Sequence, residues 1–217
     1  MSSIDVERST NRIAANAPHQ FVLDTSLFTN PDTAEQFGKN AADAVAVFTK
    51  LVRPAQSVLR CYMPQSIYEE LQGFVGAQKM PAEFELVIHL QSPSRYDVRV
   101  SGFVLYELID DIRRRIDRGL RVAEKAVRAA HPSNVETVVN KLRGEYREVL
   151  RAGLLDSRED LDLILLAREL DAALVSSDQG LTSWADRLGI RLIHPQRIRA
   201  ILDELVVEAG SKSDEQM

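Results

Sequence analysis

The hydrophobic positions of this chain follow two periods, and their alternation predicts an α/β fold. Short apolar runs with the length of buried strands lie at residues 20–24, 58–63, 172–177 and 190–193. Segments with apolar residues every three or four positions, as in amphipathic helices, lie at residues 34–52, 64–75, 82–91, 161–170, 181–188 and 195–207. Strands that alternate with helices in this way predict a Rossmann-like parallel sheet flanked by helices.

The longest periodic segment, residues 103–130, carries an apolar stripe and a basic stripe. The apolar stripe consists of Leu105, Leu108, Ile109, Ile112, Ile116, Leu120, Ala123 and Val127. The basic stripe consists of Arg114, Arg118, Arg121, Lys125 and Arg128. Steps of three and four residues put each set on its own helix face, with the basic face turned away from the apolar one. Residues 131–134 are predicted to form a turn and residues 135–151 a returning helix, which together make a long inserted α-helical hairpin.

This hairpin divides the predicted α/β domain into two parts. The organisation that we expect is a polar N-terminal extension at 1–19, the first part of the domain at 20–101, the hairpin at 102–152, the second part at 153–208 and a polar tail at 209–217. No internal repeat accompanies this arrangement.

Composition indicates the size of the domain and the cellular compartment, and it argues against a disulfide, a zinc site and a membrane segment. The chain has 217 residues, enough for one sizeable core with an inserted subdomain. Its single cysteine, Cys61, allows no disulfide within the chain and favours a reducing cytoplasm. Its four histidines lie too far apart to have zinc-ligand spacing. No apolar run approaches the roughly 20 residues that span a bilayer, so we expect a cytoplasmic protein without a membrane segment.

Charge is distributed unevenly along the chain. The net charge is −5, yet residues 113–151 hold eleven Lys and Arg against five Asp and Glu, a local balance of +6. The rest of the chain therefore carries −11. A basic hairpin attached to an acidic body is a pattern that suits binding to a polyanion such as RNA.

Acidic side chains stand where a parallel sheet would bring them together. Asp24 and Asp178 each directly follow a predicted strand, and the carboxyl ends of parallel strands form the ligand crevice of such sheets. Asp156 and Asp160 are four residues apart at the start of a predicted helix, so both can point the same way. A cluster of carboxylates needs a neutralising charge, and hard cations such as Mg²⁺ or Mn²⁺ supply it.

Each of these signals also has a simpler explanation. Asp156 and Asp160, with Ser157 between them, have the residue types that cap a helix. Asp24 could cap the following helix, and Asp178 could belong to a turn. The neighbouring Glu69 and Glu70 could be solvated helix positions, just as the basic stripe could be a solvated face. The order of the acids along the chain nevertheless favours a metal site. An Asp after a strand is followed by a Glu within a helix, an Asp at the start of a helix and an Asp after another strand.

That order, with its surrounding residues, carries a family resemblance. The strings FVLDTS, IYEEL, DSREDLDLILLA and VSSDQGL resemble the PIN-domain nucleases. FVLDTSLFTNPD, the AEFE segment with its following SPSR, YELIDDIRRRIDRGLRVAE and GLLDSREDLDLILLARELDAALVSSDQGLTSWADRLGIRLI resemble, more specifically, the HARP family of RNA-free (protein-only) ribonuclease P. The resemblance spans residues 20–202, and the extension before residue 20 is longer than the family leads us to expect.

The resemblance implies a function and a set of site residues. It implies a PIN-like fold and a metal-dependent endonuclease that removes the 5′ leader of precursor tRNA without an RNA subunit. The metal-binding, catalytic acids would be Asp24, Asp156, Asp160 and Asp178, with Glu70 as a further ligand drawn from the adjacent glutamates of IYEEL. It also implies homo-oligomers, with dimers assembled into dodecamers.

Three other functions fit parts of the same pattern. A general PIN ribonuclease, such as the toxin of a toxin–antitoxin pair, would share the acids but lack the inserted basic hairpin. A non-catalytic RNA-binding partner, for instance in RNA repair, would not need the complete acid set. A phosphatase on a Rossmann-like sheet would leave the basic stripe without a role.

Overall fold

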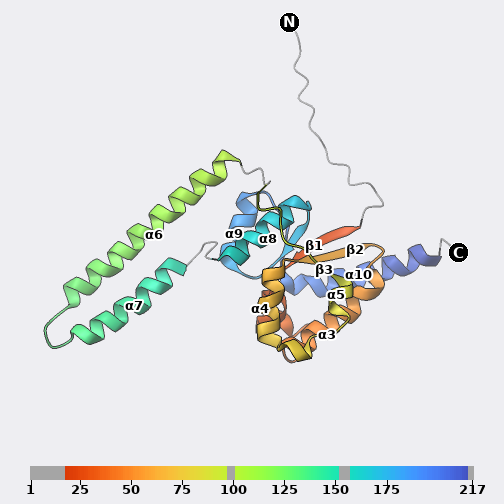
Figure 1. Ribbon diagram of the computed structural model, residues 1–217, viewed down its shortest axis with the longest axis horizontal. Coiled ribbons are helices and arrows are strands. Elements are labelled where there is room, and N and C mark those ends of the chain that lie inside the picture. Colours follow the sequence, from red (N-terminus) through yellow and green to blue (C-terminus); the bar gives the residue numbers. More distant parts are fainter. Residues whose placement is uncertain (1–17, 97–100, 152–156, 215–217) are drawn as a thin grey trace, which may run out of the picture.

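A computed structural model describes residues 18–96, 101–151 and 157–214 of the chain (Figure 1). Five strands form one sheet in which every pairing is parallel, in the order β3-β2-β1-β4-β5. The strands are β1 (His19–Leu23), β2 (Leu59–Met63), β3 (Ile88–Leu90), β4 (Ala173–Val175) and β5 (Leu192–Ile193). The predicted parallel sheet is therefore confirmed.

Helices connect these strands and flank the sheet. They are α1 (Ser26–Thr29), α2 (Pro31–Ala34), α3 (Ala41–Val52), α4 (Gln65–Val75), α5 (Phe84–Val87), α6 (Gly102–Ala129), α7 (Val135–Arg151), α8 (Arg158–Glu169), α9 (Gln179–Arg187) and α10 (Pro195–Asp214), with 3-10 turns η1 (Arg53–Ala55) and η2 (Ala77–Lys79). Helix α8 packs against β1 and β4, while α3 packs with α5 and α10. Among the described helices, none combines the length and the apolar character needed to cross a membrane.

The strand order reverses beside β1, and this reversal positions the candidate site. From β1 the chain builds outward through β2 and β3, then returns after the hairpin to add β4 and β5 on the other side of β1. The carboxyl ends of β1 and β4 thus lie side by side, with Leu23 paired to Val175. In open parallel sheets, such a switch point is where ligands bind.

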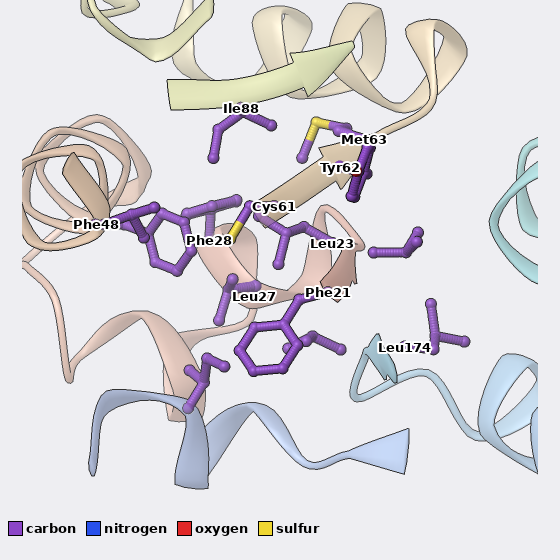
Figure 2. Close-up of a cluster of buried hydrophobic side chains, with 14 of the residues drawn as sticks. Phe21, Leu23, Leu27, Phe28, Phe48, Cys61, Tyr62, Met63, Ile88 and Leu174 are labelled. Carbon is purple, nitrogen blue, oxygen red and sulfur yellow. The ribbon is translucent and has the colours of Figure 1, made fainter. Parts of the chain in front are cut away.

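The core fixes these strand ends in place. Val22, Leu23 and Val175 are completely buried, as expected for central strands covered on both faces. Figure 2 shows side chains from β1, β2, β3 and β4 meeting residues of α1 and α3 in one cluster. Within it, the rings of Phe28 and Phe48 pack edge to face with centroids 5.2 Å apart. Residues at the switch point are therefore positioned by strand ends that are closely packed in the core.

Two helices predicted before the hairpin differ from the structure by more than two residues. The helix predicted at 34–52 begins at Ala41, because the Asn40 side chain caps it by accepting from the Asp43 N–H (3.0 Å). Before it, Gly38 approaches the helix so closely that a Cβ would lie 2.5 Å from the Asp43 Cβ. The segment predicted as a helix at 82–91 is instead the single turn α5 followed by edge strand β3.

The last helix is longer than its pattern predicts. Helix α10 continues past Val207 to Asp214, so residues 209–214 are helical rather than a polar tail. Burial of Ala209 and an ion pair between Glu208 and Lys212 (2.8 Å, one turn apart) stabilise this extension.

The predicted helical hairpin is present and projects from the α/β body (Figure 1). Helices α6 and α7 approach closely at Gly119, where an added Cβ would lie 2.7 Å from the Tyr146 ring. At its base, α6 is tied to α9 by Arg187, which pairs with Glu107 (3.2 Å) and Asp111 (3.6 Å). The hairpin is thus an arm that charged contacts hold to the body at one end.

The apolar stripe of α6 is largely uncovered along this arm. Ile112, Ile116 and Leu120 are 47%, 61% and 56% exposed. An apolar surface of this extent on a helix is a feature of protein–protein contact surfaces.

Candidate active site

Asp24 and Asp178 meet at the switch point of the sheet. Asp24 follows β1, and its backbone N–H donates to the carbonyl oxygen of Val175 at the end of β4 (3.1 Å). Asp178 lies three residues beyond that strand. Its side chain accepts from the Leu181 N–H (2.8 Å) and thereby caps α9. Asp178 therefore serves as a helix cap and also faces the cleft.

Two serine hydroxyls hold the carboxylate of Asp24 in one orientation. The side chains of Ser26 and Ser176 both donate to its Oδ2, each at 2.6 Å. Its Oδ1 receives a long contact from the Thr25 hydroxyl (3.4 Å). With Oδ2 occupied by two donors, Oδ1 is the oxygen available to an incoming cation.

Asp24 lies in a cavity of about 480 Å³ lined by acids from four segments of the chain. The lining carboxylates are Asp24, Glu70, Glu159, Asp160 and Asp178. The lining hydroxyls are those of Thr25, Ser26, Thr29, Ser66 and Ser157. Among the described residues that line this cavity, there is no Lys or Arg. The cavity is thus built to attract a cation.

Burial and the charges of neighbouring acids raise the pKa values of Asp24 and Glu70. Burial raises the pKa of Asp24 and the charge of Asp178 adds to this, while the hydrogen bonds from Ser176 and Ser26 oppose it. Desolvation also raises the pKa of Glu70, and the charges of Asp24 and Glu159 raise it further. A bound cation would relieve both effects, because it favours the ionised form.

The cavity brings together most of the acids that the sequence singles out. Asp24, Glu70, Asp160 and Asp178 all line it, whereas Asp156 lies outside the described residues. Asp160 sits in the first turn of α8, where its N–H donates to the N-cap side chain of Ser157 (3.0 Å). The capping explanation therefore holds for this turn, and the same turn also lines the cavity.

The structure also distinguishes the two glutamates of α4. Glu70 lines the cavity, while Glu69 accepts from the Gln65 side chain (3.2 Å) on the helix surface. Glu159 lines the cavity as well, although nothing in the sequence separates it from other acids of a first helical turn. Ser176 was not singled out either, since a serine that binds a carboxylate 152 positions away leaves no local signal.

The donor set fits a hard divalent cation that keeps part of its water shell. Among the described residues, no three His, Cys, Asp or Glu side chains converge closely enough to hold a metal by themselves. Mg²⁺ commonly binds through one or two carboxylates and retains several waters. An all-oxygen lining, with neither sulfur nor imidazole, suits such an ion and not a site built for zinc.

The buried carboxylate of Asp162 and an exposed arginine form an ion pair on α8, beside this cavity. Asp162, which is 3% exposed, receives the Ser66 hydroxyl (3.2 Å) and two bonds from Arg95, at 2.9 and 2.5 Å. Glu169 accepts from the backbone N–H and the hydroxyl of Ser94 (2.8 and 3.2 Å). Asp162 thus links α8 to α4 through Ser66, and the SPSR segment binds α8 through Arg95 and Ser94.

The basic stripe of α6 lies on the surface of the hairpin, away from the cavity. Arg114 pairs with Asp111, Lys125 with Glu145 (3.5 Å) and Arg128 with Glu124 (4.0 Å). The basic side chain of each pair is exposed, whereas Asp111 is buried. Arg118 and Arg121 are exposed and make no ion pair with another described residue.

Removing the charge of Asp24 is expected to stabilise the metal-free protein. An acid whose pKa is raised by folding destabilises the fold once it ionises, above its ordinary pKa of 3.8. At pH 7 in EDTA, Asp24→Asn should therefore unfold at a higher temperature than the wild type. The gain should be about 0.5–2 kcal/mol, the usual size of the effect of one stabilising substitution.

The sign of this effect should depend on pH and on metal. The advantage of Asp24→Asn should shrink as the pH falls toward 4, where the wild-type carboxyl takes up its proton. Added Mg²⁺ should raise the melting temperature of the wild type more than that of the variant. Asp186→Asn, which changes an exposed carboxylate of α9, is the matched control. A variant that melts below the wild type in EDTA would contradict the prediction.

Comparison with known proteins yields one consistent result. A family model described as PINc domain ribonuclease matches residues 20–207. The RNA-free ribonuclease P of Thermococcus onnurineus is 46% identical over 193 residues, which cover 88% of this chain and 97% of that protein. The RNA-free ribonuclease P of Pyrococcus furiosus is 43% identical over 197 residues, 90% and 98% of the two chains. The protein of the same name from Nitrosococcus oceani is 45% identical over 190 residues, which cover 86% of this chain and 95% of that protein.

Proposed function

This chain belongs to the RNA-free ribonuclease P family of PIN-domain ribonucleases, and we propose on that premise that it removes the 5′ leader of precursor tRNA. It is an endoribonuclease with a PIN-like fold. The proposed cleavage gives a leader with a 3′-hydroxyl and a tRNA with a 5′-phosphate, and needs no RNA subunit.

The observation that carries the proposal is the convergence of Asp24 and Asp178 at the switch point with Glu70 and Asp160 in one cavity. We assign metal binding to Asp24, Asp160 and Asp178, with Glu70 as a further ligand. Asp156 completes the proposed set. Ser26 and Ser176 would keep the Asp24 carboxylate oriented toward the cation, which is the usual task of side chains behind a metal ligand.

The chemistry is hydrolysis of one phosphodiester bond. When bound, Mg²⁺ or Mn²⁺ lowers the pKa of a coordinated water and neutralises charge on the leaving oxygen. The aspartates would hold this ion, and the ion's positive charge would in turn bind the phosphate. The proposed nucleophile is water, so the reaction needs neither histidine nor lysine, which suits a cavity lined by carboxylates and hydroxyls.

The basic stripe of α6 would bind the body of the tRNA. An A-form RNA is recognised through its shape and its phosphates, and arginine binds phosphate through two parallel hydrogen bonds. Arg114, Arg118, Arg121, Lys125 and Arg128 form an array along the projecting arm. Helix α6 projects from the body (Figure 1) and contributes no residue to the cavity lining, which suits a substrate held far from where it is cut.

We further propose that the working enzyme is a homo-oligomer in the cytoplasm, with dimers assembled into a dodecamer. The exposed apolar stripe of α6 supports contact with a second copy. In such an assembly one subunit could cut a precursor tRNA while another holds it. The order of the assembly rests on the family resemblance.

The test is cleavage of a precursor tRNA that carries a 5′ leader, with the cut mapped to the nucleotide. With Mg²⁺ we expect a single cut at the mature 5′ end, and with EDTA no cut. Scattered cuts would indicate a general PIN ribonuclease. Binding of tRNA without any cleavage would favour a non-catalytic RNA-binding partner and reject the proposal.

A further inference from the structure

An exposed aromatic ring stands at the rim of the acidic cavity. Phe74 lies in α4, one helical turn after Glu70, and is 62% exposed although it lines the cavity. The same helix buries Tyr68, Leu71 and Val75 in the core. Phe74 therefore adds little to the core, and its ring face is open to whatever enters the cavity.

The position of the ring matches the path of an RNA strand through the site. Residues four apart lie on the same helix face, about 6 Å apart along the axis. A strand whose phosphate is held at Glu70 and the aspartates therefore brings a neighbouring base within reach of Phe74. Bases of single strands stack on aromatic side chains whatever their sequence.

The charge of the cavity favours this kind of contact. A Lys or Arg among the acids would bind the flanking phosphates, but it would also repel the metal ion. The described lining contains neither. A neutral aromatic ring holds a nucleotide through its base and leaves the negative potential of the cavity unchanged.

We propose that Phe74 stacks on an unpaired base of the 5′ leader beside the cleaved phosphate, an inference that rests on the function proposed above. Bases of the tRNA acceptor stem are already stacked within an A-form helix and offer no free face. A leader base is single-stranded, so its face is free to stack on the ring. Phe74 thus makes the site specific for a single-stranded segment on the leader side of the cut.

The test combines variants of Phe74 with altered leaders. Single-turnover kcat/KM is measured for the wild type, Phe74→Ala and Phe74→Trp on precursor tRNA with an intact or an abasic leader nucleotide beside the cleavage site. On the intact leader, Phe74→Ala should lose roughly 5- to 100-fold, the range of one base–aromatic stack, and Phe74→Trp should retain activity. The abasic leader should slow the wild type by a similar factor and slow Phe74→Ala very little.

Controls separate stacking from other roles of the ring. Leu86→Ala removes an apolar side chain that is 75% exposed on α5 and does not line the cavity, so it should cut like the wild type. Full activity of Phe74→Ala, or an equal abasic penalty in wild type and variant, would overturn the stacking role. So would a change in the mass of the assembly on light scattering, which would make Phe74 a subunit contact. In all three cases wild-type cleavage would still stand, whereas its absence would overturn the proposed function as well.

Discussion

Asp160→Asn is expected to abolish cleavage of precursor tRNA while the protein stays folded. The amide has the size of the carboxylate but lacks its charge, so a divalent cation loses a ligand. Replacing a side chain that only supports a metal ligand typically costs 10- to 100-fold, and loss of a proposed ligand should therefore cost more than about 100-fold. Single-turnover cleavage in Mg²⁺ measures this loss.

The fold should tolerate this change because the cap of α8 does not require the carboxylate. The bond from the Asp160 N–H to the Ser157 hydroxyl belongs to the backbone and persists in the variant. Thermal unfolding in EDTA should thus stay close to that of the wild type, and binding of precursor tRNA should be retained. Asp186→Asn, the same substitution at an exposed site on α9, should cut normally. An active Asp160→Asn enzyme would remove Asp160 from the proposed metal site.

The sequence identifies acids that line the cavity because their positions follow from strand ends and helix starts. Asp24 and Asp178 each come after a short apolar run, and the chain order of strands and helices already implies parallel neighbours. What places them together is the reversal of strand order beside β1. The pairing of β1 with β4 is a contact between residues on either side of the inserted hairpin. Local hydrophobic periodicity does not predict such a long-range pairing.

The features that the sequence does not predict also depend on long-range contacts. Edge strand β3 has three residues and directly continues the turn α5, so no glycine or proline marks the change from helix to strand. The role of Ser176 depends on packing against Asp24 and on no neighbouring motif. For Phe74, helical periodicity cannot tell a core position from a rim position one turn away. Features set by tertiary contacts are the ones that sequence patterns miss.

Reversing two charges of the basic stripe is expected to weaken tRNA binding strongly. Arg118→Glu with Arg121→Glu changes two exposed arginines that make no ion pair with other described residues, so the fold loses no such contact. Each phosphate contact releases about one counterion, so losing two should flatten the salt dependence of log K by about 2. We expect at least a tenfold weaker affinity near 0.1 M salt, measured by titration across several salt concentrations.

A control in the same hairpin distinguishes specific phosphate contacts of the α6 stripe from attraction of RNA by the overall charge of the hairpin. Arg143→Glu with Arg147→Glu reverses two exposed charges of α7 and changes the net charge of the protein by the same amount. If the α6 stripe binds phosphates, the α6 pair should lose much more affinity and salt dependence than the α7 pair. Cleavage at saturating substrate should hardly change in either, because neither α6 nor α7 lines the acidic cavity. Equal losses in the two pairs would mean that the hairpin attracts RNA through its overall charge, and the stripe would then be a solvated helix face.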